Sequence, residues 1–188
     1  LSESNINDSQ LQMMFAICHP SISTEAQIGL SLRILCGFGI DEIADAFLTN
    51  KETINKRLFR AKEKLRSEQI KIELPTTDEI DKRLASVLTT IYLLFNEGYH
   101  SSVQETSIRK ELCLEAMRLC YFLLENKFTN TPSVNALMAL MCFHASRFEA
   151  RTNEAGEPIL YEQQNNDLWD QALIEKGNFF LIESAKGQ

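Results

Sequence analysis

The sequence has 188 residues, enough for one large domain or two small ones, and its 44% hydrophobic content is typical of a folded domain with a substantial core. No apolar run approaches the roughly 20 residues of a membrane-spanning helix, and the first ten residues, LSESNINDSQ, lack the regions of a signal peptide. These features exclude membrane proteins and indicate a cytoplasmic protein. Only 7 Gly and 4 Pro interrupt the chain, so we expect an all-α fold with short loops.

The first half of the chain predicts four helices. An apolar segment over 11–18 ends at His19-Pro20, because proline disfavours helix in the residue before it. A second helix begins near Ser23 and ends at Cys36-Gly37. The segment GIDEIADAF predicts a short third helix, and three further residues connect it to a basic helix over 51–66, for which Asn50 is a suitable N-cap.

The basic helix is unusual in a chain with a net charge of −7, because seven of its sixteen residues are Lys or Arg. Its apolar residues Ile54, Leu58, Ala61 and Leu65 recur at helical spacing, so the cations lie on the opposite face. A short helix, a tight turn and such a helix form a helix-turn-helix, whose second helix enters the DNA major groove. The alternative is a basic amphipathic helix that packs on its own bundle or on an acidic partner.

The segment KIELPTTDEID is a connector with a helix-breaking Pro75, and the chain is more acidic after it. We place a domain boundary there, between a DNA-binding domain (1–74) and a helical domain (75–188). In the second domain we expect helices over 79–95, 104–126, 133–151 and 166–185, with a short extended piece over 159–161. The pattern fits a compact bundle and a repeat-like superhelix equally well.

The segment FNEGYHSS places an amide, an acid, a hydroxyl and an imidazole within about one turn, at Asn96, Glu97, Tyr99 and His100. One interpretation is a ligand or regulatory pocket in the second domain, completed by His144 and Arg147. The other is a helix C-cap at Gly98, whose polar neighbours satisfy backbone groups. Trp169 and Tyr161 are expected to be packing anchors.

The five cysteines are odd in number and lie in apolar helical patterns, which is typical of reduced core residues: Cys18, Cys36, Cys113, Cys120 and Cys142. Cys18 beside His19 hints at a metal, but no CxxC or HxxxH motif supplies further ligands. No nucleophile elbow or phosphate loop is present either. We expect no metal, no cofactor and no enzymatic activity.

The segment GIDEIADAFLTNKETINKRLFRAKEKLR resembles region 4 of bacterial extracytoplasmic function (ECF) sigma factors of RNA polymerase. Its Glu42-Ile43-Ala44, Thr53-Ile54, Arg57-Leu58 and Arg60-Ala61-Lys62 match the pattern of that region. Later segments, including LTTIYLLFNEGYHSS and ALMALMCFHASR, resemble a subgroup with a long helical C-terminal extension. Two departures are Gly39, where a capping Ser or Thr is usual, and Asn55-Lys56, which leave the preferred bases open.

The resemblance implies a transcription initiation factor whose region 4 binds the −35 promoter element and core RNA polymerase. Asn55, Lys56, Phe59 and Arg60 would read bases, and the other cations would grip phosphates. The expected DNA-binding residues are Thr53, Asn55, Lys56, Arg57, Phe59, Arg60, Lys62, Lys64 and Arg66. Region 2, which reads the −10 element, precedes region 4 in this family and is not in the sequence, so we expect a fragment that does not start transcription alone.

The role of residues 75–188 stays open between two alternatives. One is a regulatory module that docks a protein partner on its acidic helices. The other makes the chain a helix-turn-helix regulator whose C-terminal domain senses a small-molecule ligand, through the candidate pocket at Glu97 and His100.

Overall fold

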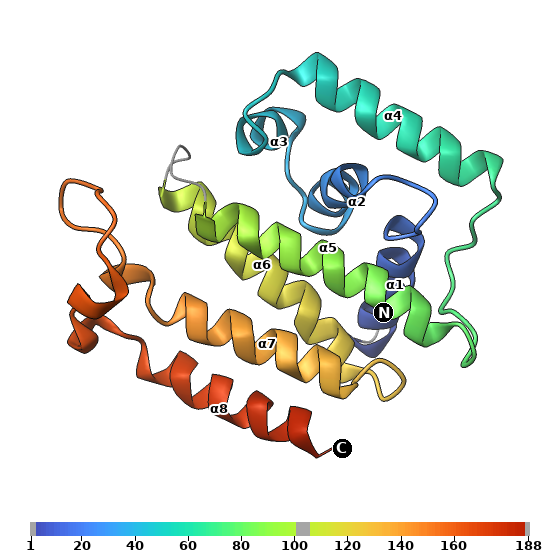
Figure 1. The fold of residues 1–188 in the computed structure, drawn as a ribbon. Helices are drawn as coiled ribbons and strands as arrows, with labels where there is room; N and C mark the ends of the chain where they lie inside the picture. Colours follow the sequence, from blue (N-terminus) through green and yellow to red (C-terminus); the bar gives the residue numbers. More distant parts are fainter. Residues whose placement is uncertain (1–2, 101–105, 187–188) are drawn as a thin grey trace. The chain divides into compact units, whose positions relative to one another are not determined.

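The computed structural model describes residues 3–100 and 106–186 of the chain. Its regular elements in these ranges are helices, and the single β-bridge, between Thr152 and Pro158, is isolated, which confirms the all-α prediction (Figure 1). None of the helices in these ranges combines the length and the apolar character needed to cross a bilayer. The α-helices are α1 (Glu3–Ile17), α2 (Thr24–Leu30), α3 (Ile40–Ala46), α4 (Lys51–Ser67), α5 (Ile80–His100), α6 (Thr106–Glu125), α7 (Pro132–Ala145) and α8 (Gln171–Ala185).

Three helices of the first half, α2, α3 and α4, begin where the sequence predicts. The Ser23 side chain accepts a hydrogen bond from the N–H of Ala26 at the start of α2, and Asn50 Oδ1 accepts from the N–H of Thr53 at 2.8 Å at the start of α4. At α3 the capping group comes from within the helix, because Glu42 Oε2 accepts from the N–H of Gly39 at 2.6 Å. A glycine at this position therefore leaves the helix start intact.

Two elements of the first half differ from the prediction. α1 begins at Glu3, well before the expected start, because its polar first turns carry no apolar periodicity. The expected second helix divides into α2 and a π-helical turn (Ser31–Leu35), in which the N–H of Cys36 donates to the carbonyl of Ser31 at 3.1 Å. No single residue type announces a π-turn, so periodicity alone does not predict it.

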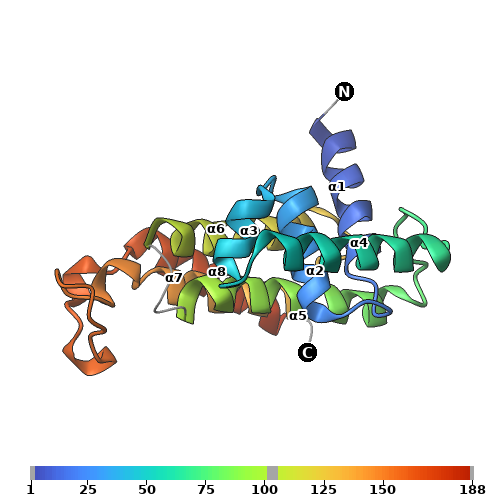
Figure 2. The same cartoon turned by 90° about the horizontal axis from the view of Figure 1, so that it is seen from above.

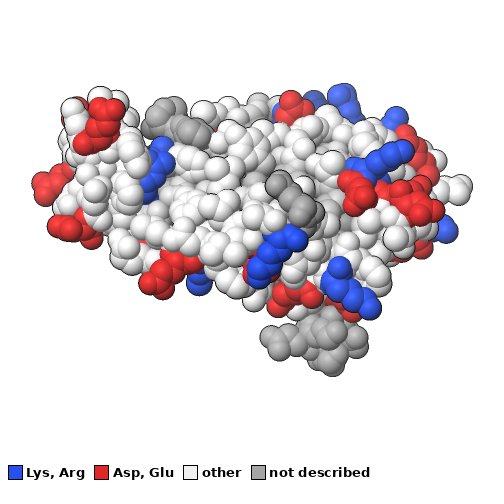
Figure 3. Space-filling model, turned by 60° about the horizontal axis from the view of Figure 1, so that its bottom comes forward, with Lys and Arg blue, Asp and Glu red and all other residues white. Residues whose placement is uncertain are grey.

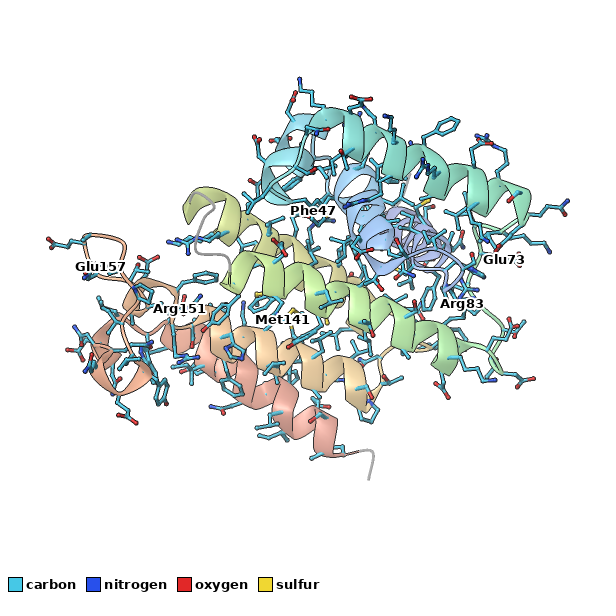
Figure 4. The ribbon with its side chains drawn as sticks, turned by 45° about the horizontal axis from the view of Figure 1, so that its top comes forward. Phe47, Glu73, Arg83, Met141, Arg151 and Glu157 are labelled. Atoms are coloured by element: carbon cyan, nitrogen blue, oxygen red, sulfur yellow. The ribbon has the colours of Figure 1, made fainter. Side chains whose placement is uncertain are left out.

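The chain forms two compact units, residues 1–129 and 130–188. Both α5 and α6 belong to the first unit, so the expected boundary after residue 74 does not coincide with the division in space. Side chains of α5 explain this, because they bind the carbonyls that α1 leaves unpaired at its end. Arg83 Nη2 donates to the carbonyl of Phe15 at 2.6 Å, and Ser86 Oγ donates to that of Cys18 at 2.8 Å (Figure 4).

Further polar contacts join α5 and α6 to the N-terminal helices. The hydroxyl of Thr90 donates to Gln27 Oε1 at 2.7 Å, and both residues are buried. On α6, Arg118 Nη2 donates to the carbonyl of Leu35 at 2.7 Å. Because a buried polar group that loses its partner is costly, these bonds specify how α5 and α6 sit on α1 and α2.

The second unit contains α7 and α8, which run antiparallel side by side (Figure 1). They pack closely at Gly177, where a Cβ atom would lie only 2.7 Å from the ring of Phe143. The segment between them holds short 3-10 turns at Phe148–Ala150, Tyr161–Gln163 and Asn166–Leu168. Leu160 has the extended backbone expected over 159–161, but these residues form no strand, and a 3-10 turn already begins at Tyr161. The ring of Tyr161 lies 5.7 Å from that of Trp169, centroid to centroid.

Candidate nucleic-acid interface

Helix α4 lies at the edge of the first unit, with α2 and α3 between it and α5 (Figures 1 and 2). Its inner face buries Ile54, Leu58 and Ala61. The close approach to α2 occurs at Gly29, where an added Cβ would lie 3.0 Å from Leu58 Cδ2. The apolar stripe predicted from the sequence is therefore the surface that holds α4 in place.

The outer face of α4 carries eight of the nine predicted DNA-binding residues in exposed positions. Phe59 is 65% exposed, which is far more than an aromatic ring in a core position would be. Arg57 is half-buried, and its guanidinium lies over the ring of Phe47 with 5.7 Å between the guanidinium carbon and the ring centroid. The exposed residues are Thr53, Asn55, Lys56, Phe59, Arg60, Lys62, Lys64 and Arg66.

Acidic neighbours on or near α4 pair with several of its cations. Lys56 Nζ lies 2.5 Å from Glu52 Oε1, Lys64 Nζ lies 3.0 Å from Glu68 Oε1, and Arg66 pairs with Glu63. Such exposed pairs contribute little to stability and are easily exchanged for a phosphate. Arg60 and Lys62 have no salt bridge among the described residues, so they offer their full charge to a ligand.

An open groove of about 610 Å³ follows one side of α4. Four cations of the helix form one wall, and the turn before α2 forms the other with Ser21 and Ser23. Cationic and hydroxyl groups facing one another are the donors that bind phosphate oxygens. No pattern in the sequence marks these two serines as ligand-binding residues, and only the packing of α2 against α4 brings them beside the basic helix. The cations of this groove are Lys56, Arg57, Arg60 and Lys64.

The predicted DNA-binding residues therefore divide into three groups. Thr53 and the four cations named above line the first groove, which we call the cationic groove. Lys62 and Arg66 border a second groove, of about 190 Å³, on the other side of α4. Asn55 and Phe59 line neither groove and project from the exposed face.

The second groove is mostly apolar and lies between α1, the π-helical turn and the end of α4. Two of its lining residues are exposed isoleucines, Ile34 and Ile72. Exposed apolar side chains rimmed by charged ones are typical of a protein-binding surface. The remaining apolar residues that line it are Met13, Ala16, Ile17, Leu30, Leu65 and Ile70.

The candidate pocket predicted in the second domain is only partly assembled. Asn96 and Glu97 line a cavity of about 510 Å³ beside Phe47 at the end of α3 (Figure 4). Tyr99 is buried and stacks on Phe95, with ring centroids 5.6 Å apart, and the side chain of His100 lies outside the described residues. The other residues that line this cavity are Thr24, Glu25, Ile28 and Leu93.

The residues proposed to complete that pocket, His144 and Arg147, belong to the second unit. There the guanidinium of Arg147 lies over the ring of Tyr161, with 4.9 Å between the guanidinium carbon and the ring centroid. The alternative of a C-cap at Gly98 was wrong, because α5 continues to His100. Gly98 instead allows α6 to approach, since a Cβ there would lie 2.6 Å from the carbonyl oxygen of Arg109.

We predict that Glu97→Gln stabilises the protein at neutral pH. Burial raises the pKa of the Glu97 carboxyl, so its stabilising contribution is complete below the unfolded-state pKa and is lost as the pH rises through the folded-state value. The glutamine side chain at position 97 does not ionise, so the variant does not lose this contribution to stability as the pH rises. Urea unfolding at pH 7 should show a higher free energy of unfolding for the variant, and the gain should disappear near about pH 4. Glu25→Gln, an exposed change at the same cavity, is the control, and an equal gain at both pH values would contradict the prediction.

The cysteines lie in the core, as their sequence pattern predicted, and Cys36 alone is half-buried. His19 lies beside Ser21, with 2.8 Å between Nδ1 and Oγ, and so supports the turn before α2. Within residues 3–100 and 106–186, no three His, Cys, Asp or Glu side chains are placed to share a metal ion.

We predict that the cysteine thiols of the folded protein react slowly with a disulfide reagent. Burial raises the pKa of Cys18 and of Cys142 to about 11, and burial together with the Glu115 carboxylate raises that of Cys36 to about 12. At pH 8 the thiolate fraction is then roughly a hundredfold below that of a free cysteine. A colorimetric thiol assay should show five fast thiols only in denaturant. A fast thiol in the folded protein would contradict this.

These features define an all-helical protein with an exposed basic helix between a cationic groove and an apolar one. The chain belongs to a family of unknown function (DUF6596), whose model matches residues 83–185. It is also 35% identical, over 174 residues, to an uncharacterized protein of Rhizobium meliloti (strain 1021). The match covers 93% of this chain but only 41% of that relative. No solved structure matches the chain.

Proposed function

We propose that α3 and α4 form a helix-turn-helix that binds promoter DNA, as region 4 of an ECF sigma factor does. The observation that carries the proposal is the exposure of Asn55, Phe59 and Arg60 on a helix whose opposite face is buried. A basic helix that packed on its own bundle would bury these side chains, so the structure favours an external partner. The charge of the helix makes that partner anionic.

In this proposal the two sides of α4 have different roles. Asn55, Phe59 and Arg60 contact base edges in the major groove, by hydrogen bonds to adenine and guanine and by apolar contact with a thymine methyl. Lys64 of the cationic groove, together with Ser21 and Ser23, binds the phosphates of one strand. Arg57 holds the ring of Phe47 and so orients α4 on α3.

The second partner in the proposal is core RNA polymerase. The apolar groove between α1 and the end of α4 supplies a surface for it that remains exposed on the opposite side from the cationic groove. Residues 75–188 would then regulate the factor or dock a further protein.

The alternative function is that of a helix-turn-helix regulator that senses a small molecule. The cavity lined by Asn96 and Glu97 favours it, because Phe47 in its wall also contacts Arg57 of α4. A ligand there would act on the basic helix through one side chain. Addition of a sensed ligand would change DNA affinity in this case, whereas dependence on core polymerase would be absent.

We predict that Arg60→Ala and Lys64→Ala weaken DNA binding in different ways. Duplexes selected from a randomised pool by the full chain are titrated with each variant by fluorescence anisotropy at several salt concentrations. Arg60→Ala should reduce discrimination between selected and unselected duplexes by about 1 to 3 kcal/mol. Lys64→Ala should weaken both classes evenly and reduce the salt dependence.

The matched control for these variants is Lys82→Ala, which removes one exposed cation from α5 in the same unit. It should leave affinity and discrimination close to those of the wild type. If Arg60→Ala weakens binding to all duplexes equally, its role as a base-reading residue is wrong. If Lys82→Ala behaves like Lys64→Ala, net charge rather than the α4 surface determines binding.

A further inference from the structure

Helix α8 of the second unit exposes an apolar row on the face opposite its contact with α7. Its contact face is defined by Gly177, which meets the ring of Phe143. Phe179 is 56% exposed and Ile182 is 61% exposed, and these two side chains are neighbours at a helical spacing of three. The surface that comes forward in Figure 3 is largely uncharged across its centre. An exposed apolar row of this kind is typical of an interaction surface.

The charges beside this row follow a regular pattern. At 100° per residue, Glu175 and Lys186 lie in line with Phe179 and Ile182, one at each end of the row, and Lys176 and Glu183 lie together on one side of it. Each of these two pairs thus carries one base and one acid. The midpoint of each pair falls close to residue 180, so both pairs are centred at the same level of the helix.

This pattern is complementary to itself when two copies of the helix lie antiparallel. A two-fold axis perpendicular to such a pair places each side of one helix against the same side of the other. Lys176 then faces Glu183 of the second copy, and Glu175 faces Lys186, so opposite charges meet in both pairs. In a parallel pair Glu175 and Lys186, which lie in the row itself, would instead each face their own copy, which is repulsive.

We propose that α8 is a homodimerisation helix that pairs antiparallel with α8 of a second copy, with Phe179 and Ile182 at the centre. The salt bridge of Lys186 with Glu183 within the helix is exposed and is exchanged for the contact between copies. One pair of 15-residue helices buries less than a standard interface of about 1,600 Å². The dimer is therefore weak, with a dissociation constant on the order of 0.1 mM.

Sedimentation equilibrium of the full 188-residue chain, at concentrations spanning that constant, tests the proposal. The wild type should form dimers and no larger species, and Phe179→Glu should weaken dimerisation at least tenfold. Lys176→Glu should weaken it about tenfold by placing two acids together. The double variant Lys176→Glu/Glu183→Lys should restore it, because the exchange recreates both pairs. Unchanged thermal unfolding of each variant shows that its fold is intact.

Comparison of Lys176→Glu with the double variant Lys176→Glu/Glu183→Lys distinguishes this interface from nonspecific association. Lys82→Glu, which changes the net charge equally on a helix of the first unit, should leave the dimer unaffected. A chain that stays monomeric at every concentration overturns the proposal, as does a double variant no better than Lys176→Glu alone. Open-ended association into larger oligomers also contradicts it, because a two-fold contact closes after two copies.

Discussion

Truncation of the chain after Leu74 is expected to unfold what remains of the first unit, although the deleted residues lie outside the region that resembles sigma region 4. Helices α5 and α6 supply buried side chains to this unit, including Leu84, Val87, Ile91 and Leu94. Burial of each contributes about 1.5 to 3 kcal/mol. Their combined loss is comparable with the whole stability of a typical domain, about 5 to 15 kcal/mol.

The truncation also leaves buried polar groups of the remaining fragment without partners. The carbonyls of Phe15 and Cys18 lose Arg83 and Ser86, and buried Gln27 loses the Thr90 hydroxyl. Each orphaned group costs about 1 to 3 kcal/mol if it stays buried. The fragment 1–74 should therefore show no cooperative thermal transition by circular dichroism.

The matched control is truncation after Thr129, at the division between the two compact units. This longer fragment keeps α5 and α6 and should unfold cooperatively. A fragment 1–74 that melts like the fragment 1–129 would show that α5 and α6 are not part of the unit.

The second large effect is expected from Gly98→Ala. In a helix interior this change normally stabilises by up to about 1 kcal/mol, because alanine has the higher helix propensity. At Gly98 the new Cβ would lie 2.6 Å from the carbonyl oxygen of Arg109 and 2.9 Å from Cys113 Sγ, so α6 must move away. We expect a net loss of about 1 to 3 kcal/mol in the free energy of unfolding.

Gly29→Ala provides the matched comparison, since it makes the same change in α2. Its nearest neighbour is the flexible end of the Leu58 side chain at 3.0 Å, which can rotate aside. Urea unfolding of the full chain should place this variant within about 1 kcal/mol of the wild type. Equal destabilisation by the two variants would mean that the α5–α6 contact at Gly98 is looser than the structure shows.

The sequence predicted best what depends on neighbouring residues. Asn50 and the apolar spacing of Ile54, Leu58 and Ala61 set both the start and the buried face of α4, so its exposed residues were identified correctly. The same local signals located the start of α7 and the end of α8 to within one residue. The predicted helices ran too far, to 151 for α7 and from 166 for α8, because each included a neighbouring 3-10 turn.

What the sequence missed depends on contacts between distant segments. Gly98 carries the usual signal of a helix end, yet the helix continues because α6 needs the space that a side chain would fill. The connector around Pro75 is non-helical, as predicted, but it does not mark a division in space, since Thr90 binds Gln27 far back in the chain. Ser21 carries no signal of its own and Ser23 only that of a helix start, and only tertiary packing places both opposite the cations of α4.

The central claim, that the outer face of α4 contacts DNA bases, is tested most directly by photo-crosslinking from position 59. The photoreactive analogue p-benzoylphenylalanine replaces Phe59 in the full chain, and in a control chain it replaces Phe128, which is similarly exposed in the same unit. With a duplex selected by the wild type, position 59 should crosslink to bases of the selected motif and position 128 should not. Absence of crosslinks from position 59 to a duplex that the chain binds, or equal yields from both positions, would contradict the account.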